Sequence, residues 1–146
     1  MLVKIAQPLR ILLVEKNEDL VALLTAVLES TGYTVKSVST GAQALVMVSS
    51  YVPDVVFTSI MIGAVNGFDL CRYLRGRPET ANALIVAITG LGMDCRDNAR
   101  SDGFDQFLMK PVELDTILAT MQHLDGYLGK TVPTLHFNWA TDSHLF

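Results

Sequence analysis

Short apolar runs alternate with helix-like stretches five times along this chain, and this alternation limits its fold more than any other feature. The run over 84–89, LIVAIT, carries no charge, which is typical of a strand buried on both faces. The predicted strands are 9–15, 33–38, 55–59, 84–89 and 105–109. Parallel strands need crossover connections, which are nearly always right-handed. The sequence therefore predicts an α/β fold with a single five-stranded parallel sheet, doubly wound, and helices on both faces.

Capping residues and apolar spacing predict the helices between these strands. Asn17 is a good helix cap, and the acidic residues after it suit the first turn of a helix. We expect Gly32 to end that helix and Thr40 to cap the next one. The segment 92–101 has almost no apolar stripe, so a weak and exposed helix is expected there. The residues expected to face the core are Leu20, Leu23, Leu24, Val27, Leu28, Ala44, Leu45, Val48, Leu70, Cys71, Leu74, Leu114, Ile117, Leu118, Met121 and Leu124.

The composition is typical of one globular domain, with 146 residues of which 50% are hydrophobic. A net charge of −4 and a pI near 5.2 argue against binding to nucleic acid. No apolar run is long enough for a transmembrane helix, and the amino-terminal run does not fit a secretory signal. Cys71 and Cys95 have neither CxxC nor metal-ligand spacing, so we expect reduced thiols and a cytoplasmic protein.

Polar residues follow four of the predicted strands at the point where each strand ends. Glu15 and Lys16 follow the first strand, Ser59 ends the third, Thr89 ends the fourth, and Lys110 follows the fifth. In an open parallel sheet, the ligand crevice lies beyond the carboxyl ends of the strands. We therefore expect these side chains to meet at one site. Each of them, taken alone, is equally compatible with a polar strand end whose hydrogen bonds are satisfied locally.

Four separated motifs, by their order and spacing, resemble the receiver domain of bacterial two-component response regulators. They are ILLVEKNEDL, PDVVFTSIMIGAVNGFDLCRYLR, IVAITGLG and FLMKPVEL, and they cover roughly residues 9–126. The resemblance implies a flavodoxin-like, three-layer fold and a signalling module rather than an enzyme. It also implies family positions for the following residues: Glu15 and Lys16 at the acidic pair that holds Mg²⁺, Ser59 at the phosphate-accepting aspartate, Thr89 and Phe107 at the switch hydroxyl and aromatic, and Lys110 and Pro111 at the family's lysine and proline. Plain core packing is the favoured interpretation of Phe107, because nothing obvious moves it without phosphorylation.

Two departures from the family pattern argue against ordinary phosphotransfer. Ser59 is a hydroxyl that needs a base to activate it, whereas an aspartate is already ionised. Lys16 replaces one acid of the metal pair, so the site has one carboxylate, Glu15, against two ammonium groups. Two unit charges about 4 Å apart interact by about 4 kcal/mol at an effective dielectric constant of about 20, and a divalent ion doubles this. We therefore expect no Mg²⁺ or other cofactor, no ready phosphotransfer from a histidine kinase, and an ion pair between Glu15 and either Lys16 or Lys110.

The resemblance and its departures leave three functions open. The first is a degenerate, pseudo-receiver signalling module of a two-component or phosphorelay system, which binds a protein partner or a second copy. Its contact face would combine 92–101, the strand 105–109 and the last helix, a face that receivers resemble each other in using. The second is an anion- or small-ligand-binding domain, or a weak enzyme, that uses the crevice at Ser59. The third is a conventional receiver with a substitute phosphate acceptor, Asp54 or Asp69.

The carboxyl-terminal end of the chain differs from the rest. We predict a receiver-like domain over 1–128 and a tail or linker over 129–146. The tail has Pro133, then Leu135, Phe137, Trp139 and Phe146 without a clean periodicity. Both a linker and a docking segment, on a partner or on the body of the domain, therefore stay open.

Overall fold

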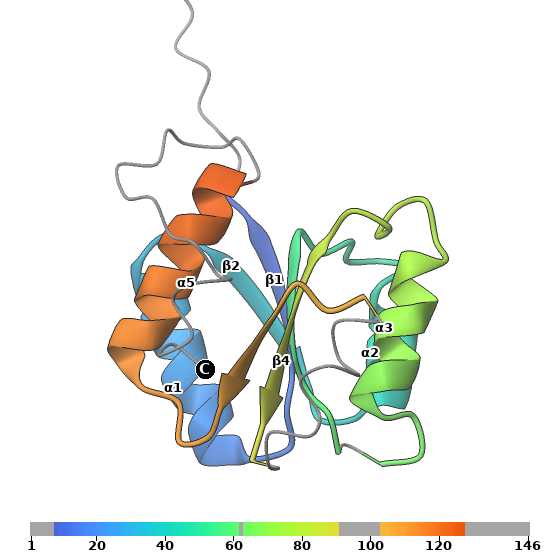
Figure 1. The fold of residues 1–146 in the computed structure, drawn as a ribbon, viewed down its shortest axis with the longest axis horizontal. Helices are drawn as coiled ribbons and strands as arrows, with labels where there is room; N and C mark the ends of the chain where they lie inside the picture. The colour runs from blue at the N-terminus through green and yellow to red at the C-terminus, as the bar shows by residue number, and fades with distance from the viewer. Residues whose placement is uncertain (1–7, 62, 91–102, 128–146) are drawn as a thin grey trace, which may run out of the picture.

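The computed structural model describes residues 8–61, 63–90 and 103–127, and for 124–127 the backbone alone. Within these ranges the chain forms one parallel sheet with the strand order β2-β1-β3-β4-β5 (Figure 1). The strands are β1 (Arg10–Val14), β2 (Thr34–Val38), β3 (Val55–Ser59), β4 (Leu84–Thr89) and β5 (Gln106–Met109). The helices are α1 (Glu18–Ser30), α2 (Gly41–Met47), α3 (Gly67–Arg75) and α5 (Leu114–Tyr127). The predicted weak helix over 92–101 and the tail lie outside the described residues.

The molecule has three layers with the sheet in the middle. Helices α1 and α5 cover one face, and α2 and α3 cover the other (Figure 1). Ile11 and Phe57 enter the core cluster under α1 and α5, while Leu12 and Val56 enter the cluster under α2 and α3. Neighbouring strand residues enter different clusters because side chains alternate along a strand. The predicted doubly wound, flavodoxin-like fold is confirmed.

Burial along the strands follows their position in the sheet. Every residue of β3 and β4 is buried, as their apolar runs predicted, whereas β2 at the edge has no fully buried residue. The observed strand bounds differ from the predicted ones by one residue at most. Such differences arise because an apolar pattern marks the middle of a strand better than its ends. None of the described helices is long and apolar enough to cross a membrane.

The helix ends confirm the predicted caps. Asn17 Oδ1 accepts a hydrogen bond from a backbone N–H in the first turn of α1, at 3.0 Å. Gly32 follows α1 with a φ of 101°, a conformation that favours glycine. Thr40 caps α2 in a capping box, as Asn66 and Asp69 do for α3. These short-range hydrogen bonds explain why the helix starts were predictable from local sequence.

Three leucines that were predicted to face the core lie at the surface instead. Leu23 and Leu114 are each 42% exposed, and Leu118 is 37% exposed, while Ile117 and Met121 on α5 are buried. A helix that packs on a sheet buries only one stripe of its surface. The leucines extend the apolar pattern beyond that stripe, so spacing alone placed them wrongly.

Candidate functional site

The polar strand ends meet in a small crevice at the carboxyl edge of the sheet, with a volume of about 130 Å³. Its lining residues are Glu15, Lys16, Ser59, Ile60, Met61, Ile88, Thr89, Gly90 and Lys110. Val14 pairs with Thr58 across β1 and β3, so the residues that follow them, Glu15 and Ser59, come together at the strand ends. The structure therefore brings together all five residues that the sequence placed at this edge.

Glu15 is the centre of the crevice and is only 2% exposed. Its Oε1 accepts a hydrogen bond from Ser59 Oγ and forms an ion pair with Lys110 Nζ at 2.9 Å. Its Oε2 accepts a hydrogen bond from the backbone N–H of Asn17 at 2.9 Å. The predicted internal ion pair is present, and Lys110 is the lysine that makes it. The sequence indicated Asn17 only as a helix cap and missed this second contact.

The contacts of Glu15 determine its protonation. Burial raises the pKa of the Glu15 carboxyl, because it removes water from the charged form. The hydrogen bonds from Ser59 and the Asn17 N–H, together with Lys110, act in the opposite direction and prevail, so the pKa of Glu15 lies below its ordinary value. Glu15 is therefore ionised at neutral pH, and Lys110 balances its charge inside the protein.

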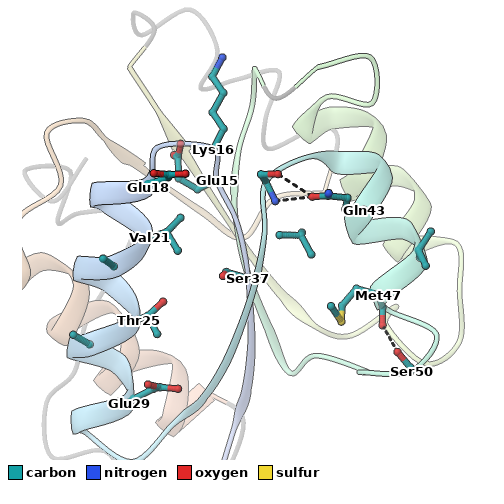
Figure 2. A pocket seen from close by; sticks show the side chains of 15 residues that line it. Glu15, Lys16, Glu18, Val21, Thr25, Glu29, Ser37, Gln43, Met47 and Ser50 are labelled. Atoms are coloured by element: carbon teal, nitrogen blue, oxygen red, sulfur yellow. Dashed lines mark hydrogen bonds between the residues drawn. The ribbon is translucent and has the colours of Figure 1, made fainter.

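Lys16 lies at the rim of the crevice. The residue is exposed, and its side chain points away from Glu15 and from the body of the domain (Figure 2). Lys110, in contrast, is held over the crevice, where its backbone N–H donates to the Thr89 carbonyl oxygen at 2.8 Å. The sequence could not distinguish the two lysines, because each directly follows a strand at the same edge.

The other predicted site residues lie at different depths around this centre. Thr89 ends β4, lines the crevice and is 4% exposed. Phe107 lies in β5, where it pairs with Ala87 and packs in the core cluster under α2 and α3. Pro111 is exposed and begins the connection to α5. Core packing accounts for the burial of Phe107, and the switch role that the resemblance implies stays a prediction.

The start of α3 packs against the end of β3. The Gly67 N–H donates to the Ile60 carbonyl oxygen at 2.8 Å. A Cβ added to Gly67 would lie 2.7 Å from the Ser59 carbonyl oxygen, which is too close for any other residue without movement of the backbone. Glycine thus allows the cap of α3 to pack directly against the end of β3 and to hold the backbone of Ser59.

The donor set of the crevice does not suit a divalent cation. Mg²⁺ takes an octahedron of oxygen ligands that usually includes one or two carboxylates. Glu15 is the one carboxylate among the lining residues, and both of its oxygens already accept contacts within the protein. In the described part of the chain, no three His, Cys, Asp or Glu side chains are grouped so that they could hold a metal ion.

Neither substitute phosphate acceptor lies among the lining residues of the crevice. Asp54 directly precedes β3, at the opposite edge of the sheet, and its carboxylate accepts a hydrogen bond from the Arg10 N–H at 2.8 Å. Asp69 lies in the first turn of α3, where it accepts from the Asn66 N–H and pairs with Arg72 at 2.6 Å. Both carboxylates have local structural contacts, so the geometry does not favour either as a phosphate acceptor.

A larger groove, which was not predicted from the sequence, lies between α1 and α2 along β2 (Figure 2). Its volume is about 1050 Å³. Val46 on α2 lines this groove and is 75% exposed. The sequence did contain a signal for this groove. Val46 is an apolar residue of α2, while Ala44 of the same helix and Val48 directly after it already enter the core.

Comparisons with known proteins agree with this geometry. The family model described as "Response regulator receiver domain" matches residues 11–122. The phosphate regulon transcriptional regulatory protein PhoB of Rhizobium meliloti is 32% identical over 114 residues, which are 77% of this chain and 50% of PhoB. The response regulator PleD of Caulobacter vibrioides is 34% identical over 119 residues, which are 81% of this chain and 26% of PleD. The chain therefore spans about half of one curated relative and about a quarter of the other.

Solved structures show the same fold. The signal receiver domain of a signal transduction histidine kinase from Syntrophus aciditrophicus has a TM-score of 0.74 and 30% identity, and the match covers 88% of this chain and 99% of that domain. The receiver domain of the sensor histidine kinase PA1611 from Pseudomonas aeruginosa, solved with a magnesium ion in its active site cleft, has a TM-score of 0.72 and 26% identity, covering 79% and 95%. Motifs, fold and relatives agree that this chain belongs to the response regulator receiver domain family of two-component signalling.

Proposed function

We propose that this receiver domain is a pseudo-receiver, which accepts no phosphoryl group at Ser59, holds no Mg²⁺ and acts by binding another protein chain. The observation that carries the proposal is the ion pair of Glu15 with Lys110, to which the Ser59 hydroxyl adds a hydrogen bond. These internal contacts occupy the positions that the family uses for its metal and its phosphate acceptor.

The setting of Ser59 argues against nucleophilic attack. Ser59 Oγ donates a hydrogen bond to Glu15, so Glu15 is the group that would have to act as the base. An efficient general base has a pKa near the working pH. The pKa of Glu15 is lowered, because the hydrogen bonds from Ser59 and the Asn17 N–H, together with Lys110, stabilise the charged form and outweigh burial. Glu15 therefore orients the serine without activating it.

The charge balance argues against Mg²⁺. A metal ion would have to replace Lys110 on Glu15 and would then lie near the displaced ammonium group, with one carboxylate as its anionic ligand. Each repulsion with a unit charge is worth several kcal/mol, by the estimate of about 4 kcal/mol for a unit pair about 4 Å apart. The attraction between the metal ion and a single carboxylate therefore does not compensate for the lost ion pair and the repulsion from the lysine.

The described part of the proposed contact face supports a role in protein binding. Leu114 and Leu118 are 42% and 37% exposed, and they lie one turn apart on α5. Residues four apart on a helix share one side, so the two leucines form a continuous apolar surface. The partner is a second protein chain or a second copy of this one, and the segment 92–101 is expected to complete the face.

Phosphorylation is tested by incubation with acetyl phosphate and Mg²⁺, followed by intact-mass measurement. The wild-type mass is expected to stay unchanged, because Ser59 lacks an activating base and the crevice lacks the metal ligands. A stable adduct of one phosphoryl group on Ser59 would refute the proposal. The matched control is the double variant Ser59→Asp, Lys16→Asp, which restores the family's carboxylates. This variant is expected to bind Mg²⁺ in calorimetry and to gain the adduct, whereas equal Mg²⁺ binding by the wild type would contradict the proposal.

The contact face is tested separately by Leu118→Arg, which is expected to abolish association with the partner or with a second copy. The reason is that a charged side chain in an apolar contact loses its hydration without gaining a partner. Leu23→Arg is the matched control, since Leu23 is also 42% exposed but lies on α1. Association, measured by analytical ultracentrifugation or pull-down, that survives Leu118→Arg would count against this face.

Binding of a small anion in the crevice stays the second candidate. Lys16, Lys110 and Thr89 all line the crevice, which has room for a small ion. The geometry favours the first candidate, because an anion would have to draw Lys110 and Ser59 away from Glu15. Calorimetric titration with phosphate and sulfate separates the two candidates. Binding that Lys110→Ala removes would support an anion site, and no binding by the wild type would exclude it for these ions.

A further inference from the structure

The β2 edge of the sheet offers a place for another strand. β2 pairs with β1 on one side, and none of the described residues pairs with its other side. The groove of about 1050 Å³ between α1 and α2 runs along this open side (Figure 2). An unpaired edge is a template for further pairing, and natural proteins usually cover it. The groove also exceeds the size of most small-molecule pockets, so a stretch of polypeptide suits it better.

The α1 wall of this groove has room for large side chains. Ala22 and Ala26 line the groove, are exposed, and are four residues apart, so they lie on the same side of the helix. Val21 and Thr25 flank them in the wall. A row of small and branched residues beside an open strand edge leaves space for aromatic rings.

The tail of this chain contains a segment with matching properties. Over 134–140, TLHFNWA, the large apolar residues Leu135, Phe137 and Trp139 are two positions apart, with polar residues between them. Strict alternation is typical of a strand with one buried face. The tail as a whole has no clean period, but these seven residues do. Their three large side chains would all point to one side of a strand.

The topology allows this segment to reach β2. Leu118, Met121 and Gln122 of α5 share a hollow of about 330 Å³ with Thr31 and Tyr33, which lie in the turn between α1 and β2. Helix α5 runs back to the edge of the sheet at which the strands begin (Figure 1). The residues between α5 and the segment, 128–133, can span roughly 20 Å, at about 3.3 Å per residue. The connection has to pass the end of α1, which lies about 8–10 Å from α5 where two helices pack directly, and then descend to the sheet layer beside β2.

The handedness of this connection is also favourable. From β1 the chain moves through α1 to the β2 side of the sheet. From β5 it would move through α5, on the same face as α1 (Figure 1), in the same direction. The two crossovers would therefore have the same hand, and right-handed crossovers are strongly preferred. The new strand would run parallel to β2, as every other pair in the sheet does.

We propose that residues 134–140 of the same chain form a sixth strand, parallel to β2, with Leu135, Phe137 and Trp139 packed against Ala22 and Ala26 of α1. This strand covers the open edge and turns an exposed groove into part of the core.

Trp139 is the one tryptophan of the chain, so its fluorescence reports on the segment directly. In the wild-type chain of 146 residues, its emission is expected to be blue-shifted relative to tryptophan in water and protected from acrylamide. Ala26→Arg is expected to shift the emission to the red and to increase quenching, because the larger side chain fills the space for the rings. Ala42→Arg is the matched control: Ala42 is exposed on α2 outside the groove lining, and its replacement is expected to change neither property.

A second variant, Phe137→Asp, guards against a simple folding defect, because it leaves α1 and β2 unaltered. It is expected to give the same red shift as Ala26→Arg, with an unchanged far-UV circular dichroism spectrum of the body. Wild-type emission like that of tryptophan in water, or an equal response to Ala26→Arg and Ala42→Arg, would overturn the proposal. Light scattering shows which chain supplies the segment in the groove. A blue shift in a monomer supports the segment of the same chain. A blue shift seen only in a dimer overturns the proposal in favour of the segment of a second copy.

Discussion

At each of the two ends of the parallel strands, a charged side chain makes contacts with several elements. At the carboxyl edge, Glu15 accepts from Ser59, from Lys110 and from the Asn17 N–H. At the opposite edge, Arg75 donates to backbone carbonyls and to a carboxylate. The Glu15 carboxylate accepts from several donors at the position where the family binds a cation. The Arg75 guanidinium donates to several acceptors in the loops before β4 and β5. One charged group with several partners therefore occurs at both ends of the strands, and at the carboxyl end it lies in the crevice.

Arg75 shows what a purely structural centre needs. Its donors reach the carbonyl oxygens of Ala81, Ala83 and Gly103, and they pair with Asp105 at 2.7 Å. These acceptors belong to the connections that precede β4 and β5. A guanidinium has five donors in a fixed plane, which suits several carbonyls at once. Glu15 has only acceptor atoms, and both of its oxygens already accept contacts, from Ser59, Lys110 and the Asn17 N–H.

Arg75→Ala is expected to give the largest loss of stability, about 3 kcal/mol, because several partly buried carbonyls and Asp105 lose a charged donor together. Urea unfolding followed by circular dichroism measures this change. Arg72→Ala is the control, since its pair with Asp69 is exposed, with side-chain exposures of 54% and 41%. That variant is expected to lose less than about 0.5 kcal/mol. Equal losses in the two variants would show that Arg75 does not join the loops.

Lys110→Met is expected to reduce the free energy of unfolding by about 2 kcal/mol, because Glu15 stays buried and loses its counter-charge. The loss is smaller than for a fully buried pair, since the Lys110 side chain is 35% exposed and Ser59 and Asn17 still donate to the carboxylate. Lys16→Met, at the exposed rim, is expected to change stability little. If Lys110→Met were more stable than the wild type in the same urea experiment, the ion pair would be destabilising, and the prediction would be wrong.

The pH dependence of stability is expected to show the smallest effect of the three. The pKa of Glu15 is lowered in the folded protein from an ordinary value of 4.5. Its contribution to stability is therefore fully present above pH 4.5 and is lost as the pH falls through the lower, folded-state pKa. The wild type is expected to be more stable than Glu15→Gln at pH 7, with the difference shrinking below pH 4.5. A difference that does not change between pH 7 and pH 3, measured by urea unfolding, would contradict an ionised Glu15.

Sequence reasoning predicted most of the fold and the membership of the crevice. Alternating apolar runs located β3 and β4, and local hydrogen-bonding residues such as Asn17 and Thr40 located the helix starts. Both signals are short-range, so they can be read without knowing the tertiary structure. The surface leucines of α5 were predicted wrongly, because spacing shows which side of a helix is apolar but not how much of that side another element covers.

By itself, the sequence determined that Glu15, Ser59 and Lys110 stand at one edge of a parallel sheet, since each directly follows or ends a predicted strand. Only the tertiary structure decided that Lys110, and not Lys16, pairs with Glu15, and that the described residues of α1, β2 and α2 form a groove beside β2. The physical reason is the distance along the chain over which each kind of interaction acts. Strand and helix signals act over a few neighbouring residues, whereas an ion pair or a groove depends on how distant elements pack in three dimensions.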